Sequence, residues 1–185
     1  MTQHVCPWWL GYLLASPLRR LMQDPLKVLA PYVREGMTVL EPGPGMGFLT
    51  LELARLVGPA GRVVAVDIQP HMLSRLKRRA AGAGLLERVD ARSAAPDTLG
   101  IADLAGAVDF TLAFALVHEL PHVEPFFAEV AMASKLGAGL LFAEPAGHVK
   151  RADFEVELEA AIHAGFELVD RPAIRNSHAA FLKRA

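Results

Sequence analysis

Cysteine is nearly absent from this chain of 185 residues, in which Cys6 is the single copy. One cysteine excludes intrachain disulfides, cysteine-based zinc sites and cysteine-bound iron–sulfur clusters. Long apolar runs are lacking too, since a membrane span needs about 20 consecutive apolar residues. The longest charge-free stretch, 1–18, is interrupted by Pro7 and Pro17, and its first basic residues, Arg19 and Arg20, follow the apolar part. That order is wrong for a secretory signal, so we expect a cytoplasmic protein with no membrane span.

An excess of either charge is also lacking. Nineteen basic and 20 acidic side chains give a formal net charge of −1. Proteins that hold nucleic acid or anionic membranes by general electrostatics need surplus Lys and Arg. The basic stretch at 75–79 is expected to be the solvated outer face of a helix. We therefore expect no nucleic-acid partner. The sequence makes no prediction about the oligomeric state.

Apolar residues are plentiful, at 52% hydrophobic against 21% charged, which favours one packed domain. From residue 37 onward short β-prone runs alternate with helical patterns. Strands are expected at 38–40, 63–66, 89–91, 110–114, 140–143, 167–169 and 179–182. Intervening helices favour a doubly wound, mostly parallel, seven-stranded α/β sheet, and the missing last helix predicts a terminal antiparallel hairpin. We expect residues 1–36 to form a helical cap and 37–185 the core.

A glycine-rich turn follows the first expected strand, with the sequence Glu41-Pro-Gly43-Pro-Gly45-Met-Gly47. Alternate glycines allow tight turning and close approach of the backbone to a ligand. Asp67 closes the second strand, where a carboxylate can accept hydrogen bonds from ribose hydroxyls. A dinucleotide fingerprint would require glycine in place of Phe48, and no Walker lysine is present. Glu41 disfavours a pyrophosphate and favours a ligand with an amine or sulfonium cation.

These residues resemble the class I S-adenosylmethionine-dependent methyltransferases. The resemblance covers about residues 33–185 and includes 63–72, 108–110, Glu144-Pro145 and 164–166 beside the glycine turn. It implies a Rossmann-like methyltransferase fold and S-adenosylmethionine as the cofactor. Glu41 would lie near the amino-acid end of the cofactor and Asp67 would hold the ribose hydroxyls. The resemblance also implies that the backbone approaches the cofactor closely at three glycines and that two apolar side chains pack near the adenine. These residues are Gly43, Gly45 and Gly47, and Ile68 and Met72.

Two further cofactor contacts come from the third and fourth strands. In this family the third strand commonly ends with a small residue and an aspartate near the adenine amine. Here Ser93-Ala94-Ala95 stands in that region, and Asp97 falls two positions late. Adenine recognition is therefore assigned to backbone groups or to Ser93. The segment after the fourth strand often contacts cofactor and substrate in this family, which adds Phe114.

His118 is the first candidate for a base or a substrate contact, because a neutral imidazole suits proton transfer near pH 7. Glu119, Glu144 and His148 are weaker candidates. Residues 118–122 match the H-E-x-x-H zinc-peptidase pattern, but Pro121 would break the helix that this pattern needs, so no metal is predicted. An aromatic-lined pocket for an apolar acceptor is expected to involve four residues: Trp8, Trp9, Tyr12 and His148.

The sequence thus predicts in-line methyl transfer from S-adenosylmethionine to a small, apolar molecule. One alternative keeps the fold and gives a module that binds S-adenosylmethionine or S-adenosylhomocysteine without catalysis. Another is an NAD-dependent oxidoreductase, which Phe48 and Glu41 disfavour.

Overall fold

The computed structural model describes residues 24–185, which divide into two compact units, 24–95 (the N-unit) and 96–185 (the C-unit). The first 23 residues of the predicted cap, with Trp8, Trp9 and Tyr12, lie outside the described residues. The boundary between cap and core at residue 36 therefore stays a prediction. Within 24–185 no helix is both long enough and apolar enough to cross a membrane.

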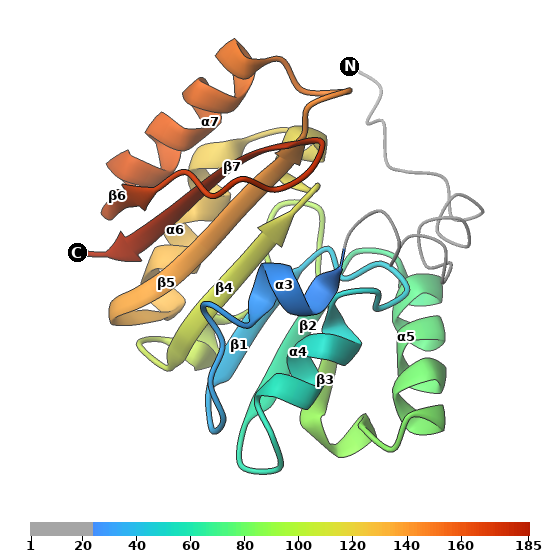
Figure 1. The fold of residues 1–185 in the computed structure, drawn as a ribbon. Helices are drawn as coiled ribbons and strands as arrows, with labels where there is room; N and C mark the ends of the chain where they lie inside the picture. Colours follow the sequence, from blue (N-terminus) through green and yellow to red (C-terminus); the bar gives the residue numbers. More distant parts are fainter. Residues whose placement is uncertain (1–23) are drawn as a thin grey trace. The chain divides into compact units, whose positions relative to one another are not determined.

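The N-unit is built on three parallel strands in the order β3-β2-β1 (Figure 1). Their bounds are β1 Thr38–Pro42, β2 Arg62–Asp67 and β3 Val89–Ser93. β2 is buried from its second residue to its last, as expected for a parallel strand covered on both faces. The carboxyl ends of the three strands lie at one edge, where open α/β sheets bind their ligands.

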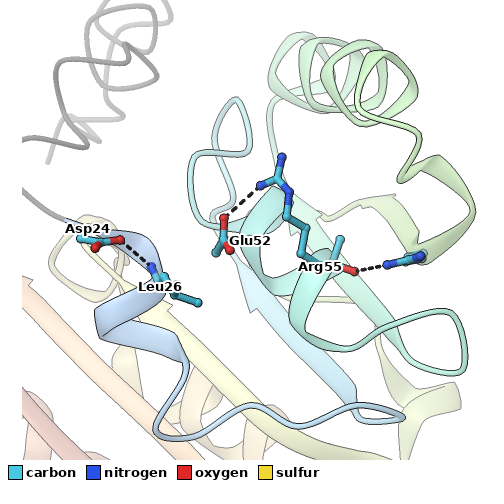
Figure 2. Close-up of polar contacts among 6 residues, drawn as sticks. Asp24, Leu26, Glu52 and Arg55 are labelled. Carbon is cyan, nitrogen blue, oxygen red and sulfur yellow. Dashed lines mark hydrogen bonds and ion pairs between the residues drawn. The ribbon is translucent and has the colours of Figure 1, made fainter.

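The helices of the N-unit are α3 Pro25–Leu29, α4 Thr50–Leu56 and α5 Pro70–Gly82, with a 3-10 turn at Leu86–Arg88. α3 begins after Asp24, whose carboxylate accepts a hydrogen bond from the Leu26 N–H at 3.1 Å (Figure 2). On α4, Glu52 and Arg55 form an ion pair of 2.9 Å, also drawn in Figure 2. Both contacts are local and follow directly from residue spacing.

The C-unit contains four strands in the order β4-β5-β7-β6, with β4 and β5 parallel and β7 antiparallel to both neighbours (Figure 1). Their bounds are β4 Val108–Phe114, β5 Ser134–Pro145, β6 Phe166–Asp170 and β7 Ser177–Arg184. The helices are α6 Val123–Ala133 and α7 Arg151–His163, with 3-10 turns at Ala102–Leu104 and Val117–Glu119.

The seven strands follow the order β3-β2-β1-β4-β5-β7-β6, which confirms the predicted α/β sheet with a terminal antiparallel hairpin. The strand expected at 140–143 is longer than predicted, because β5 already begins at Ser134, directly after α6 ends at Ala133. The Ser134 hydroxyl donates to the Val130 carbonyl at 2.7 Å, which satisfies a carbonyl of the last helical turn. Gly137, with φ of 76°, then lies in a bulge between two paired stretches of β5.

Candidate functional site

The glycine turn after β1 is a left-handed backbone path, with φ of 68° at Gly43, 53° at Gly45 and 83° at Gly47. Residues with a side chain rarely adopt these positive φ angles, so this backbone path requires glycine at the three positions. The positions differ in their surroundings. The Leu76 side chain occupies the space that a Cβ at Gly47 would need, whereas nothing in residues 24–185 lies within 4 Å of a Cβ at Gly45. Gly47 therefore serves helix packing, and Gly45 faces space that a ligand can use.

Arg79 of α5 anchors this turn by donating a hydrogen bond to the Met46 carbonyl. The expected solvated face is found at Lys77 and Arg78, which are exposed, but Arg75 and Arg79 are half-buried. The expectation was therefore wrong for Arg75 and Arg79. A helix of 13 residues turns its side chains through all directions, so a run of basic residues cannot all face solvent.

Asp67 ends β2 with its residue surface 9% exposed. Its carboxylate accepts a hydrogen bond from the Gln69 N–H at 2.8 Å. Burial raises the pKa of Asp67, and the backbone N–H groups of Gln69, Gly45 and Ile68 oppose that rise. Asp67 thus lies against the glycine turn, at the strand end where the resemblance places the ribose.

Glu41 is the second carboxylate of this edge, 4% exposed at the end of β1. Burial raises its pKa to about 7; the nearby Thr50 hydroxyl opposes the rise and the negative charge of Asp67 adds to it. Glu41 Oε2 and Thr50 Oγ1 are both buried, and neither has a hydrogen-bond partner within residues 24–185. A buried acceptor without a donor is costly, and an ammonium group of a bound ligand would satisfy it.

The other predicted cofactor residues of the N-unit lie around the same strand ends. Ser93 ends β3 in register with Asp67, and it is exposed. Ile68, directly after Asp67, leaves 41% of its surface exposed, so it presents an apolar face at this edge. Met72 is 4% exposed within α5 and belongs to the core of the unit. Their contacts with a cofactor remain predictions.

In the C-unit, the loop after β4 has a constrained backbone. Ala115 has φ of 54°, a conformation that residues other than glycine rarely adopt, and its N–H donates to the Ala143 carbonyl at 2.8 Å. Phe114 and Leu116, on either side of Ala115, are half-buried. Such backbone strain persists only where the surroundings hold it in place, and it concentrates at functional sites.

Glu144 at the end of β5 organises this loop. Its side chain is fully buried, and Oε1 accepts hydrogen bonds from the N–H groups of Leu116 at 3.2 Å and Val117 at 2.7 Å. Oε2 is bonded to His118 Nδ1. This bond raises the pKa of His118, burial opposes it, and the negative charges of Glu144, Glu119 and Glu157 add to the rise. The structure therefore unites two separately predicted candidates, His118 and Glu144, in one pair.

Glu157 of α7 is a third group of this cluster, and sequence reasoning missed it. It is 8% exposed, and its Oε2 is buried without a hydrogen-bond partner in residues 24–185. Burial raises the pKa of Glu157 to about 7; Glu144 and Asp153 raise it further and His118 opposes them. A glutamate inside a helix with many charged neighbours carries no signal that separates it from a solvated one.

Two predicted residues lie less centrally. Glu119, in the 3-10 turn with His118, is half-buried, and His148 is exposed in the turn after β5. No group of three or more His, Cys, Asp or Glu side chains in residues 24–185 is arranged to hold a metal ion. The structure thus gathers two clusters: Glu41, Asp67 and the glycine turn in the N-unit, and His118, Glu144 and Glu157 in the C-unit.

Comparison with known proteins places this geometry in context. A family profile described as "Methyltransferase domain" matches residues 39–137, more than half of the chain. The crystal structure of a SAM-dependent methyltransferase from Aquifex aeolicus superposes with a TM-score of 0.86, covering 98% of this chain and all of that one at 24% identity. That likeness shows the fold.

Two curated relatives match parts of the chain. The ubiquinone/menaquinone biosynthesis C-methyltransferase UbiE of Klebsiella pneumoniae is 38% identical over 71 residues, or 38% of this chain and 28% of that protein. The ribosomal RNA small subunit methyltransferase A of Magnetococcus marinus is 32% identical over 145 residues, 74% of this chain and 51% of that protein. The chain therefore spans about a quarter to a half of these relatives' length.

Proposed function

Because the chain belongs to the S-adenosylmethionine-dependent methyltransferase family, we propose that it transfers a methyl group to a small, largely apolar molecule. One observation carries the cofactor assignment. Within residues 24–185, Glu41 Oε2 is a buried acceptor without a donor, and no atom fills the space beside Gly45 in the left-handed turn of the same unit. An amino acid with a cationic amine fits that carboxylate, and a phosphate would be repelled by it.

S-adenosylmethionine, when bound, supplies a methyl group on a positively charged sulfur and leaves as S-adenosylhomocysteine. In the proposal Glu41 binds the cofactor's ammonium group, and Asp67 accepts hydrogen bonds from its ribose hydroxyls. Ser93, beside Asp67, and the apolar face of Ile68 hold the adenine. Phe114, at the end of β4, stays a proposed cofactor contact. The protein's task is alignment and exclusion of water, because the cofactor carries the leaving group.

A small apolar acceptor is supported by the loop that contains His118. Phe114, Leu116 and Leu120 are half-buried there, so they leave apolar surface near the imidazole. The near-neutral charge of the chain gives no general attraction for a polyanion. The aromatic residues Trp8, Trp9 and Tyr12 stay part of the proposal as walls of the acceptor pocket, together with His148.

Isothermal titration of the full chain with S-adenosylhomocysteine and with NAD tests the cofactor assignment. We expect heat with the first ligand at about 100 μM protein and none with NAD. Asp67→Ala should weaken binding at least about tenfold, because two charge-assisted hydrogen bonds are lost. Asp90→Ala is the matched control, since this aspartate on β3 has a side chain 40% exposed. Equal affinity of both variants would remove Asp67 from the site.

RNA is the second candidate acceptor, because the match over 145 residues is to a protein named as a ribosomal RNA methyltransferase. A screen with a labelled methyl donor, comparing small hydroxylated aromatic molecules with ribosomal RNA, distinguishes the two. Transfer only to RNA would overturn the small-molecule proposal. Cofactor binding without transfer to any acceptor class would favour the non-catalytic binding module.

A further inference from the structure

The hydrogen bonds of the Glu144 carboxylate indicate how this residue acts on His118. Two backbone N–H groups, of Leu116 and Val117, donate to Oε1 of the Glu144 carboxylate, and His118 Nδ1 is the hydrogen-bond partner of Oε2. Backbone N–H groups can only donate, so Oε1 acts purely as an acceptor. Two backbone hydrogen bonds to one oxygen of a fully buried carboxyl group stabilise its anionic form.

The arrangement determines which nitrogen of His118 carries the proton. An anionic carboxylate opposite Nδ1 accepts a hydrogen bond, so Nδ1 must be the protonated nitrogen of the neutral ring. The lone pair then lies on Nε2, which has no hydrogen-bond partner within residues 24–185. The His118 side chain keeps 26% of its surface exposed, so a ligand can reach the ring.

We infer that Glu144 is a positioning residue, which orients His118 to accept a proton. The methyl acceptor is then a molecule with a phenol-type hydroxyl, whose oxygen attacks the methyl group and loses its proton. The inference rests on the proposed methyl-transfer function and deepens it. It is supported by the strained Ala115, which holds the loop of His118 against β5. His118 follows β4 and Glu144 ends β5, and these strands are parallel, so the pair lies at a ligand-binding strand edge.

The proton balance favours that acceptor class. When an oxygen gains a methyl group it loses the hydrogen it carried, and Nε2 of His118 takes this proton. The resulting imidazolium is neutralised by Glu144, which already holds Nδ1–H. A phenol has a pKa of about 10, like tyrosine, and therefore yields its proton to imidazole far more readily than an aliphatic alcohol.

Several groups around the pair influence its titration. Glu144 of β5, Glu119 of the 3-10 turn and Glu157 of α7 all raise the pKa of His118, and burial opposes them. Asp153 of α7 acts on Glu157, and His178 of β7 is the cross-strand neighbour of Glu144. Because the free base is the active form, methyl transfer should increase with pH through the raised pKa of His118.

Nitrogen-15 NMR of the full chain, without any cofactor, tests the pair directly. We expect neutral His118 as the Nδ1–H form, with a proton affinity above that of free imidazole. Glu144→Gln should lower that affinity at least tenfold and shift the ring toward the Nε2–H form, because an amide nitrogen donates to Nδ1. Glu157→Gln, the control, should lower the affinity less and leave the tautomer unchanged. An Nε2–H form in the unchanged protein would overturn the inference.

His118→Asn, in a partly exposed loop, keeps the inference testable if Glu144→Gln does not fold. It should reduce kcat with a phenol acceptor at least 100-fold, remove the rise of kcat with pH, and leave the affinity for S-adenosylhomocysteine within twofold. Unchanged kcat and pH profile, in a protein that binds S-adenosylhomocysteine, would contradict the inference while leaving the proposed function intact. Absence of cofactor binding in the unchanged protein would instead contradict the proposed function.

Discussion

Glu41 in the N-unit and Glu144 in the C-unit are both buried carboxylates at the carboxyl ends of parallel strands, yet their surroundings differ. Glu144 binds two backbone N–H groups and an imidazole. Glu41 keeps Oε2 without a partner in residues 24–185, and its burial raises its pKa to about 7. A buried carboxylate whose hydrogen bonds are all made by the protein holds its protein partners in position. One with an unpaired oxygen is stabilised instead by a ligand that supplies the missing donor.

Glu157 lies in the C-unit, but its surroundings resemble those of Glu41. Within residues 24–185 both have a buried oxygen without a hydrogen-bond partner, and burial raises the pKa of each to about 7. In the N-unit such a group faces the proposed cofactor amine. In the C-unit it lies beside a complete pair and makes that environment more negative. In the proposal, the same local chemistry binds a ligand in one unit, and in the other its negative charge raises the pKa of His118.

The largest expected effect would break the N-unit framework. Gly47→Ala must place a Cβ where the Leu76 side chain lies, with φ at 83°. We expect a loss of about 2–3 kcal/mol in the free energy of unfolding, measured by urea titration. Gly45→Ala, which meets open space, should lose about 1 kcal/mol but bind S-adenosylhomocysteine at least about tenfold more weakly. Equal losses of stability would refute the distinction between the two glycines.

The next effect concerns the pH dependence that Glu157 brings to the C-unit. Its pKa is raised from 4.5 to about 7, so the folded protein holds this proton more tightly than the unfolded chain. This contribution to stability is present below pH 4.5 and is lost as pH rises to about 7.

Glu157→Gln should remove that loss and increase the free energy of unfolding at pH 8 by about 2–3 kcal/mol relative to its effect at pH 4. Urea unfolding at both pH values measures the difference. Glu159→Gln, exposed on the same helix, is the matched control and should change stability equally at both. A pH-independent effect of Glu157→Gln would mean that its carboxylate is hydrated.

Arg79 offers a smaller and more selective test of the glycine turn. Arg79→Ala removes the hydrogen bond to the Met46 carbonyl, so the turn is held less firmly. We expect the affinity for S-adenosylhomocysteine to fall about fivefold, corresponding to one hydrogen bond of about 1 kcal/mol. Arg78→Ala changes an exposed neighbour and should leave affinity unchanged. Identical affinities would show that the turn does not depend on Arg79.

The smallest effect is expected at an exposed ion pair of the C-unit. Arg171 and Glu155 form two hydrogen bonds, of 2.9 and 2.7 Å, with side chains 39% and 36% exposed. Exposed pairs contribute little, so Arg171→Ala should cost about 0.5 kcal/mol in urea unfolding and leave cofactor affinity unchanged. A large change in affinity would reveal coupling that the positions of these residues give no reason to expect.

Most elements were predictable because their signals are local. The β1 run, the glycine turn and Asp67 at the end of β2 stand where strand propensity and glycine spacing placed them. The early start of β5 was missed, since the pairing of Ser134 with Val108 and the bulge at Gly137 depend on β4. Local propensity cannot represent a partner strand that is distant in sequence.

For the candidate site, residue types and strand ends were enough to nominate Glu41, Asp67 and His118, because glycine conformation and strand termini are properties of short segments. The pairing of His118 with Glu144, 26 residues apart, and the burial of Glu157 on a charged helix required the packed chain. Burial, hydrogen-bond completion and raised pKa values arise from contacts between segments. Local sequence therefore predicted where ligands bind, and packing established which carboxylates have complete hydrogen bonds within residues 24–185 and which do not.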